Sequence, residues 1–302
     1  YKLIQQSANR YGGHFSRSDG VNYARLEQDE SHLRHLISIQ ENIHKIHPLM
    51  VGLIGYYKHT CQFEKQQSLI KRAHSLISTS SSLVNEQETL VYYLNKQGAL
   101  FNSLGKFSRA IEIYEQALKI EIEQQSVSNQ HIETLKGLGE SYLSLEGIED
   151  NSLNNALQYF SDALNGCKRL DSNIKNNQPE IAEIQGYIGI CYEKLDDYEN
   201  ALIHHELSQE IRLELYGENH LETAKCYTNL ATIKQKQHDY NSALSLLFKS
   251  LKIKTLAFGT LPNEQIAALY FDIGICHLNL KDLIKARESF EKSVEQNKKL
   301  YH

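Results

Sequence analysis

Tryptophan is absent from the sequence, and proline occurs only three times in 302 residues. Because proline interrupts helices more strongly than any other residue, few forced helix breaks are expected. Leucine, isoleucine, alanine, glutamate, lysine and glutamine are abundant, and this composition favours helices almost throughout. No apolar run approaches the roughly 20 residues that a membrane-spanning helix needs. The composition therefore predicts an all-α protein without membrane insertion.

The sequence also lacks a strong charge of either sign and any close pair of cysteines. A formal net charge of −5 argues against a dedicated nucleic-acid binder. The five cysteines show no CxxC spacing, and their odd number favours reduced thiols in a cytoplasmic protein. The chain opens at Tyr1 with neither a methionine nor a signal peptide, so we expect it to be a segment of a longer protein.

Motifs that carry catalysis or hold a cofactor are missing as well. The Gly-Lys pair at 105–106 lacks the upstream glycine of a phosphate-binding loop. His205 begins a fragment similar to a zinc-protease motif, but Gln209 stands where that motif has its second histidine. His44 and His47 lie one turn apart, and nothing near them in the sequence supplies further metal ligands. We therefore expect no enzyme activity, no cofactor and no metal site.

Small residues, in contrast, recur at a fixed spacing. A spacing of twelve joins Gly98 to Ala110, Gly189 to Ala201, Ala231 to Ala243 and Gly274 to Ala286. Apolar residues around each of these pairs follow helical steps of three and four, with a short polar turn between the two helices. Small side chains let two helices approach closely, but a lone helix pair cannot bury its apolar face. Copies of such a pair stack into one continuous core, which is the signature of a solenoid.

Five copies of the helix pair are expected over 83–302, preceded by an N-terminal helical region over 1–82. The copies span 88–120, 131–170, 179–214, 220–254 and 264–300. The second copy has extra residues within 146–151, and a loop insertion explains them because lengthening an exposed loop changes stability little. The N-terminal region should contain a helix over 23–46, a new helix start permitted by Pro48, one divergent pair over 50–77 and a polar linker over 78–82.

These residues resemble the tetratricopeptide repeat. That repeat has a small residue and an aromatic on its first helix (A), then Ala, an aromatic and Ala on its second (B). The first copy matches with Gly98, Phe101, Ala110, Tyr114 and Ala117. The period of about 42 residues, and the stretch GENHLETA that opens the fourth copy, are similar to the kinesin-light-chain variety. A histidine at 205 and serines at 208, 250 and 293 depart from the pattern, so the core should be locally softer there.

The resemblance implies a right-handed superhelical solenoid of antiparallel helix pairs, in which the A helices line a concave face. The outward positions lie six and three residues before the first small residue of each pair, and one and four after it. At or beside these positions we select a candidate peptide- or protein-binding site: Tyr92, Asn95, Asn102, Lys136, Glu140, Lys225, Thr228, Asn229, Thr232, Phe271, Ile275 and Leu278. The asparagines would hydrogen-bond the backbone of an extended peptide, and the last three residues would accept an apolar side chain.

Two functional hypotheses follow. In the first, the chain is a non-enzymatic scaffold that binds a protein or peptide on the concave face. In the second, the chain is the sensing region of a larger signalling ATPase. Residues 25–34, followed by the divergent pair, are similar to the helical arm that leads into the repeats of signal-transduction ATPases.

The last predicted helix, over 283–300, has an apolar face formed by Ile284, Phe290 and Val294. Stacked repeats usually end in a helix with a polar outer face. We therefore expect that further repeats follow or that this end meets another surface, as it would in an oligomer.

Overall fold

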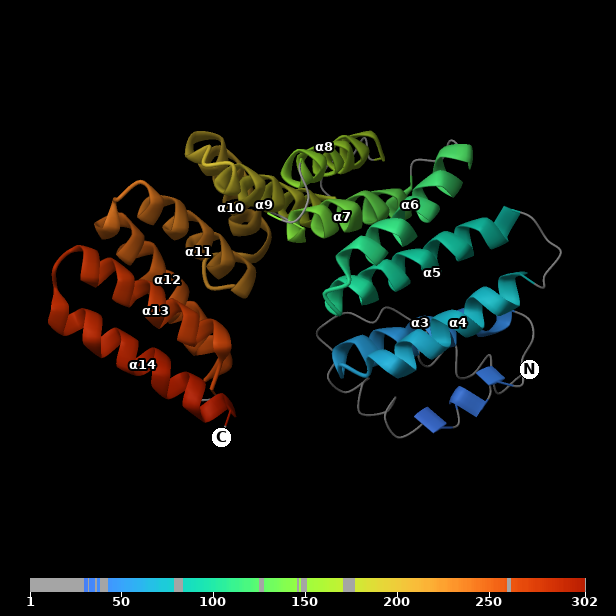
Figure 1. Cartoon of the computed structure of the whole chain (residues 1–302), viewed down its shortest axis with the longest axis horizontal. Helices are drawn as coiled ribbons and strands as arrows, with labels where there is room; N and C mark the ends of the chain where they lie inside the picture. The colour runs from blue at the N-terminus through green and yellow to red at the C-terminus, as the bar shows by residue number, and fades with distance from the viewer. Residues whose placement is uncertain are drawn as a thin grey trace. The chain divides into compact units, whose positions relative to one another are not determined.

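The computed structural model describes residues 30–31, 33–35, 37–38, 43–78, 84–124, 128–145, 147, 151–170, 177–259 and 262–301. Every regular element within these ranges is an α-helix, which confirms the all-α prediction (Figure 1). Helices joined by short turns pack against each other as antiparallel pairs. These pairs are α3 with α4, α5 with α6, α9 with α10, α11 with α12, and α13 with α14.

The chain forms two compact units, Tyr1–Leu145 and Glu146–His302. The first unit contains α3 (Ile43–His59), α4 (Phe63–Ser78), α5 (Val84–Ser103), α6 (Phe107–Gln124) and α7 (Asn129–Ser144). The second contains α8 (Ser152–Leu170), α9 (Gln178–Lys194), α10 (Tyr198–Tyr216), α11 (Leu221–Lys236), α12 (Tyr240–Phe258), α13 (Glu264–Asn279) and α14 (Leu283–Tyr301). This division falls elsewhere than residue 82, and the grouping of 83–302 as one repeat domain stays a prediction.

One turn geometry recurs between the two helices of a pair. A residue with positive φ lies in each turn: Cys61, Gly105, Asp196, His238 and Lys281. The next amide then reaches back to a carbonyl in the last turn of helix A, as from the Asp239 N–H to the Lys234 oxygen at 2.9 Å. This closure satisfies carbonyls that the end of a helix leaves open. Of these five residues only Gly105 is a glycine, the residue that adopts a positive φ without steric cost. Packing of the pair therefore imposes the turn on the other four residues.

Small residues lie where the helices of a pair touch. Ala110, Ala201 and Ala243 are fully buried. A Cβ atom added to Gly274 would lie 2.6 Å from the ring of Phe290, which belongs to helix B of the same pair. The ring therefore occupies the space where a side chain at 274 would lie. The spacing of twelve reflects this close packing, because protein interiors leave no room for an extra methyl group.

The serines that replace alanine in helix B are well accommodated. Ser208 donates a hydrogen bond to the Ala182 carbonyl at 2.6 Å, and Ser250 donates to the Ala224 carbonyl at 2.9 Å. Both acceptors lie at the equivalent position of helix A, seven residues before the small residue of the pair. Both buried hydroxyls thus have a partner, which limits the cost of placing them in the core; that the core is softer there stays a prediction.

The predicted helix start after Pro48 is wrong. Helix α3 begins at Ile43 and continues through Pro48 to His59. A proline this close to a helix start removes a single backbone hydrogen bond. The residues that follow, Leu49, Met50 and Leu53, are almost completely buried in the first unit's core, and this burial keeps the helix intact.

Four other predictions fall mainly on residues that the structure does not describe. They are the helix over 23–46, the segment 25–34 that is similar to signalling ATPases, the linker over 78–82 and the insertion within 146–151.

Three further observations concern chemistry. Within the described ranges, no helix combines the length and apolarity required to cross a membrane. The same ranges contain no cluster of three or more His, Cys, Asp or Glu side chains that could hold a metal ion. All five cysteines belong to the described residues and are free thiols, and only Cys61 is exposed.

Candidate functional site

The predicted site residues form two groups, one in each unit. We call Tyr92, Asn95, Asn102, Lys136 and Glu140, on α5 and α7, the first-unit face. We call Lys225, Thr228, Asn229, Thr232, Phe271, Ile275 and Leu278, on α11 and α13, the second-unit face. Gln235 links α11 to α13, because its Nε2 donates to the Asp272 carbonyl at 3.2 Å and to Cys276 Sγ at 3.0 Å.

Asn95 does not lie on a surface, which corrects its assignment as a binding residue. The side chain is fully buried between α5 and α7. Its Nδ2 donates to the Gln130 carbonyl at 3.2 Å, and its Oδ1 accepts from Thr134 at 3.0 Å. A buried amide is retained where it finds such partners, so Asn95 holds two neighbouring helix pairs together. It offers no group to a ligand.

The other members of the first-unit face are only partly available. Tyr92 is half-buried, with the Lys96 ammonium 4.9 Å from its ring centroid and the His47 ring 5.2 Å away. The Asn102 oxygen accepts from Ser141 at 2.8 Å. Lys136 and Glu140 are half-buried and already interact within the chain. The first-unit face is thus occupied mainly by contacts between its own helices.

The second-unit face is more open. Lys225 is exposed and pairs with Glu222 one turn earlier, at 2.6 Å. Thr228 and Thr232 are half-buried and donate to carbonyls of their own helix. Asn229 is half-buried, and its amide has no hydrogen-bond partner among the residues that the structure describes. Asn229 is therefore an unpaired polar group of α11 among the residues that the structure describes.

Helix α13 contributes the apolar part of the second-unit face. Phe271 is 51% exposed, and its ring centroid lies 5.5 Å from that of Phe290 on α14. Ile275 is half-buried, whereas Leu278 is 49% exposed. Leu278 lines a groove against α14. Both Phe271 and Leu278 therefore lie beside residues of α14.

A buried polar position that the repeat pattern did not reveal recurs in helix B. It lies eleven residues after the second small residue of a pair, the alanine of helix B. The residues there are Glu121 after Ala110, Arg212 after Ala201 and Lys254 after Ala243. These three side chains are only 4%, 8% and 5% exposed. In each case the residue lies where helix B meets helix A of the next pair. Counting eleven residues on from the alanine of helix B in each pair would have found this buried polar position in the sequence.

In the first unit, Glu121 of α6 finds its partners on α7. One carboxylate oxygen lies 3.2 Å from His131 Nδ1, and the other accepts from Thr134 at 3.2 Å. Arg212 of α10 finds partners in the second unit. Its guanidinium donates to Ser208 Oγ at 2.9 Å and to Cys226 Sγ at 3.3 Å, and it lies 3.7 Å from a Glu222 oxygen.

Lys254 of α12 differs. Among the described residues it has no hydrogen-bond or ion-pair partner, although it is buried slightly more deeply than Arg212. Burial lowers the pKa of Lys254, as does the positive charge of Lys225, while the Asp272 carboxylate opposes both. Burial also raises the pKa of Asp272, against the effect of Lys254.

The two adjacent histidines of α10 have separate environments. His205 is 1% exposed and covers Gly189, whose added Cβ would lie 2.7 Å from the ring. Burial lowers the pKa of His205 to about 4, helped by the charges of His204 and Arg212. His204 Nδ1 lies 2.5 Å from Gln185 Oε1 on α9. Both rings are therefore part of the helix packing, and neither is placed to share a metal ion with a second ligand.

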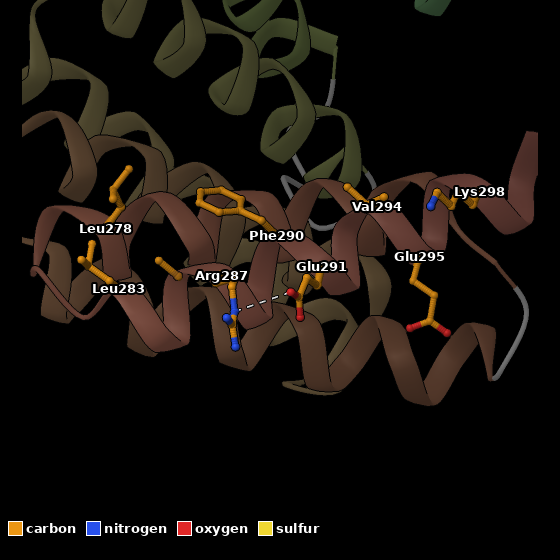
Figure 2. A pocket seen from close by; sticks show the side chains of 9 residues that line it. Leu278, Leu283, Arg287, Phe290, Glu291, Val294, Glu295 and Lys298 are labelled. Atoms are coloured by element: carbon orange, nitrogen blue, oxygen red, sulfur yellow. Dashed lines mark ion pairs between the residues drawn. The ribbon is translucent and has the colours of Figure 1, made fainter.

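A second candidate surface is the groove between α13 and α14, which has a volume of about 600 Å³. Figure 2 shows its apolar side chains, Leu278, Leu283, Phe290 and Val294, along one side of α14. Charged residues border the groove: Arg287 pairs with Glu291 at 3.6 Å, and Glu295 and Lys298 follow. Leu283 is 66% exposed and Val294 is 51% exposed, so this stripe is uncovered in the structure.

Comparisons with known proteins agree with this geometry. Two family models, each described as a tetratricopeptide repeat, match the chain, one over 180–255 and the other over 91–121 and 267–300. A search of curated protein sequences gives no significant match.

Solved structures share the fold at low sequence identity. BtubC (BKLC) from P. vanneervenii is 17% identical with a TM-score of 0.63, covering 80% of this chain and 92% of BtubC. A putative kinesin light chain from Podosopora anserina with nearly identical repeats is 13% identical with a TM-score of 0.56, covering 70% and 96%. NprR in complex with its cognate peptide NprX is 15% identical with a TM-score of 0.63, covering 99% and 81%.

These likenesses concern the fold, since identities of this size do not carry a function across. The fold, the paired helices with small residues twelve apart and the three matched segments nevertheless agree on one family. The segments 91–121, 180–255 and 267–300 are tetratricopeptide repeats, and the chain has the fold of a tetratricopeptide-repeat solenoid.

Proposed function

We propose that the chain is a non-enzymatic scaffold of a reducing compartment such as the cytoplasm, and that it binds an extended peptide or protein segment across the second-unit face. The observation that carries this proposal is the pairing of an unsatisfied amide, Asn229 on α11, with an exposed aromatic, Phe271 on the neighbouring helix α13. An amide can hydrogen-bond a peptide backbone, and an exposed phenylalanine can cover an apolar side chain.

Two further points support this surface over the first-unit face. In the first-unit face, Asn95 and the Asn102 oxygen are engaged between α5 and α7, and the unpaired Nδ2 of Asn102 is buried, so this face has fewer groups to offer. The fold is also shared with NprR, which has been solved with a bound peptide. Protein-binding sites characteristically combine an apolar anchor with a few placed polar groups.

A peptide-retention experiment tests the proposal. The purified full chain is mixed with a pool of short random-sequence peptides, and the retained peptides are identified by mass spectrometry. The variant Lys225→Glu with Asn229→Ala should lose them, because it reverses a charge and removes the amide. A matched control, Lys252→Glu with Asn241→Ala, makes the same two changes at exposed positions of α12. Retention by the first variant, or no retention by the wild type, would reject the site.

The α13–α14 groove supports a second proposal, self-association. We propose that it is covered by the α14 helix of a second copy, running antiparallel. The charges along the stripe are self-complementary, since Arg287 precedes Glu291 and Glu295. A two-fold axis near the middle of α14 would bring Arg287 of each copy towards the acidic residues of the other, and would do so twice. The exposed leucines and Val294 would be buried between the two helices.

Sedimentation velocity over a concentration series checks this second proposal. The wild type should form a dimer, and Val294→Glu should be monomeric because it places a carboxylate within the apolar stripe. Leu256→Glu is a matched control, because Leu256 is 72% exposed on α12 and does not line the groove. A monomeric wild type, or a dimer that survives Val294→Glu, would contradict the proposal.

A further inference from the structure

The outer side of α10 carries apolar side chains that the neighbouring helices leave uncovered. Helix α10 packs against α9 and α11, and the residues that it buries are Ala201, His205, Ser208 and Arg212. Ile203, in contrast, is 52% exposed, and Leu207 and Leu213 are 40% and 36% exposed. A single exposed apolar residue needs no explanation, but three along one side of a helix form a surface that a partner can cover.

Glutamates surround these apolar residues. Four of them are exposed on the same helix: Glu199, Glu206, Glu210 and Glu214. Nine residues, or about two and a half turns, separate Ala201 from Glu210, so the acidic side lies opposite the buried side. The helix has no lysine, and its single arginine, Arg212, is buried. We call the four glutamates and the three exposed apolar residues the α10 outer face.

The charges of the α10 outer face are not balanced by the described part of the chain. Glu206, Glu210 and Glu214 follow each other at intervals of four residues, a spacing at which like charges on a helix repel. None of the four glutamates forms an ion pair or a side-chain hydrogen bond with a described residue. Helix α14 treats its glutamates differently, since Arg287 pairs with Glu291 at the same interval. A positively charged partner would relieve the repulsion on α10.

The charge of the α10 outer face also decides between possible occupants. Four glutamates would repel a nucleic acid or an anionic membrane. A second copy of this chain could offer α12, which has no acidic residue and exposes Lys249 and Lys252. The Lys249 ammonium, however, already lies 5.3 Å from the ring centroid of Tyr227. The outer side of α12 thus brings one uncommitted cation to four glutamates, and the face fits a more basic partner.

We propose that the α10 outer face docks a basic amphipathic helix of another protein. Lysine or arginine at every fourth position of that helix would match the spacing of the glutamates, and apolar residues beside them would cover Ile203 and Leu207. Exposed ion pairs contribute little each, so the apolar contact holds the helix and the charges select it. One helix lying on another buries a small area, so the complex should be transient.

Fluorescence anisotropy with the full chain tests this proposal. The probe is a labelled amphipathic peptide of about 20 residues, long enough to form a helix, with lysine at every fourth position and leucines on the same side. A second peptide carries glutamate in place of each lysine. We expect the lysine peptide to bind and the glutamate peptide not to bind. Added salt should weaken the binding, because it screens exposed charges.

Two charge variants locate the binding. Glu206→Lys with Glu210→Lys should bind the lysine peptide at least about tenfold more weakly, because two attractive contacts become repulsive. Its matched control, Glu112→Lys with Glu115→Lys, makes the same change of net charge at exposed positions of α6 and should bind as the wild type does. An equal loss in this control, or equal binding of the two peptides by the wild type, would overturn the proposal.

Two further variants test the apolar contact. Ile203→Ser should weaken binding of the lysine peptide about tenfold, because it removes apolar surface that the docked helix would cover. Ile122→Ser is the matched control at a residue that is 63% exposed on α6, and it should have no effect. Unchanged binding by Ile203→Ser would mean that the peptide is held by charge alone, and the docking surface would be wrong.

The remaining outcomes separate this surface from the two proposed above. The second-unit face belongs to other helices, so Lys225→Glu with Asn229→Ala should bind the lysine peptide as the wild type does. Loss of binding there would overturn the proposal. A dimer of Val294→Glu that Ile203→Ser abolishes would assign the α10 outer face to a second copy, and would also overturn it. Circular dichroism checks that each variant is folded, and Glu206→Gln with Glu210→Gln replaces the lysine variant if that variant is not.

Discussion

Arg212 and Lys254 occupy the same position in consecutive helix pairs of the second unit, yet only Arg212 has its partners inside the chain. At the α10–α11 junction the guanidinium contacts Ser208, Cys226 and Glu222. At the α12–α13 junction Lys254 is 5% exposed and has no hydrogen-bond or ion-pair partner among the described residues. Both helices carry a serine one turn earlier that donates to helix A of its own pair. The two positions differ in the partners that the following helix A supplies.

This comparison shows how the electrostatics of a repeat can change without a change of fold. Three helices contribute a buried charged residue at the same position of helix B, and the following helix A decides whether that residue has a close partner. A buried charge without a close partner is expected to cost some stability.

The largest effect that we expect concerns His205, which lies two turns before Arg212 on α10. Its pKa is lowered from the ordinary value of 6.5 to about 4 in the folded chain. Between these two values the unfolded chain binds a proton that the folded chain does not, so stability falls as the pH drops from about 6.5 towards 4. The shift corresponds to about 3 kcal/mol.

His205→Phe should remove this pH dependence, since Phe160 and Phe290 hold the equivalent positions in other pairs. Urea unfolding of both proteins at several pH values between 7 and 4 measures it. As the pH falls from about 6.5 towards 4, the unfolding free energy of the wild type should drop relative to that of His205→Phe, because only the wild type carries the histidine contribution. Parallel curves would show that His205 does not titrate in this way.

Arg212→Met should destabilise the chain by about 2 to 3 kcal/mol, because it breaks a buried charge pair and leaves acceptors without a donor. The figure lies at the low end of the usual range, since Glu222 stays partly exposed and keeps Lys225 as a partner. Thermal unfolding measures the change. Glu222→Gln should reproduce part of the loss, and an unaltered melting temperature in Arg212→Met would remove the basis for the comparison of the two junctions.

Much of this architecture could be predicted from the sequence, because packing within a pair leaves a local signature. The spacing from Gly274 to Ala286 marks a place where two helices touch, and any such contact demands small side chains. The turns were not predictable residue by residue. Asp196, His238 and Lys281 adopt a backbone that favours glycine, and only the closure of the pair explains why.

The candidate site was harder to predict, because the outward positions of a helix A meet both solvent and the next pair. Asn95 and Asn229 lie at or beside such positions in different pairs, yet one is buried between helices and the other has an unpaired amide. What separates them is the identity of residues about forty positions away, such as Thr134 and Gln130 for Asn95. Lys254 was missed for the same reason, since its lack of a partner depends on Gln265 and Leu269 of the following helix.

Gly189→Ala and Gly274→Ala should each cost about 2 kcal/mol, because the added methyl group overpacks the interface. In both cases the new Cβ would lie under 3 Å from a ring on helix B, His205 in one pair and Phe290 in the other. Similar losses would show that the close contact within a pair is equivalent in α9–α10 and α13–α14. Gly55→Ala is the control, since nothing lies within 4 Å of its added Cβ and alanine favours a helix. A loss at only one of the two glycines would mean that these two pairs differ in packing.

Lys254→Met should have the smallest effect on stability and the opposite sign to Arg212→Met, a gain of about 1 kcal/mol at neutral pH. An apolar side chain of similar length removes the desolvation of an unpaired charge and keeps the contacts of the stem. The gain should shrink as the pH rises. The lowered pKa of Lys254 means that the folded wild type loses its proton before the unfolded chain does, so the wild type becomes relatively more stable at alkaline pH. Thermal unfolding of both proteins at neutral and alkaline pH measures this. A loss of stability in Lys254→Met comparable to that in Arg212→Met would mean that Lys254 has a stabilising partner within the chain.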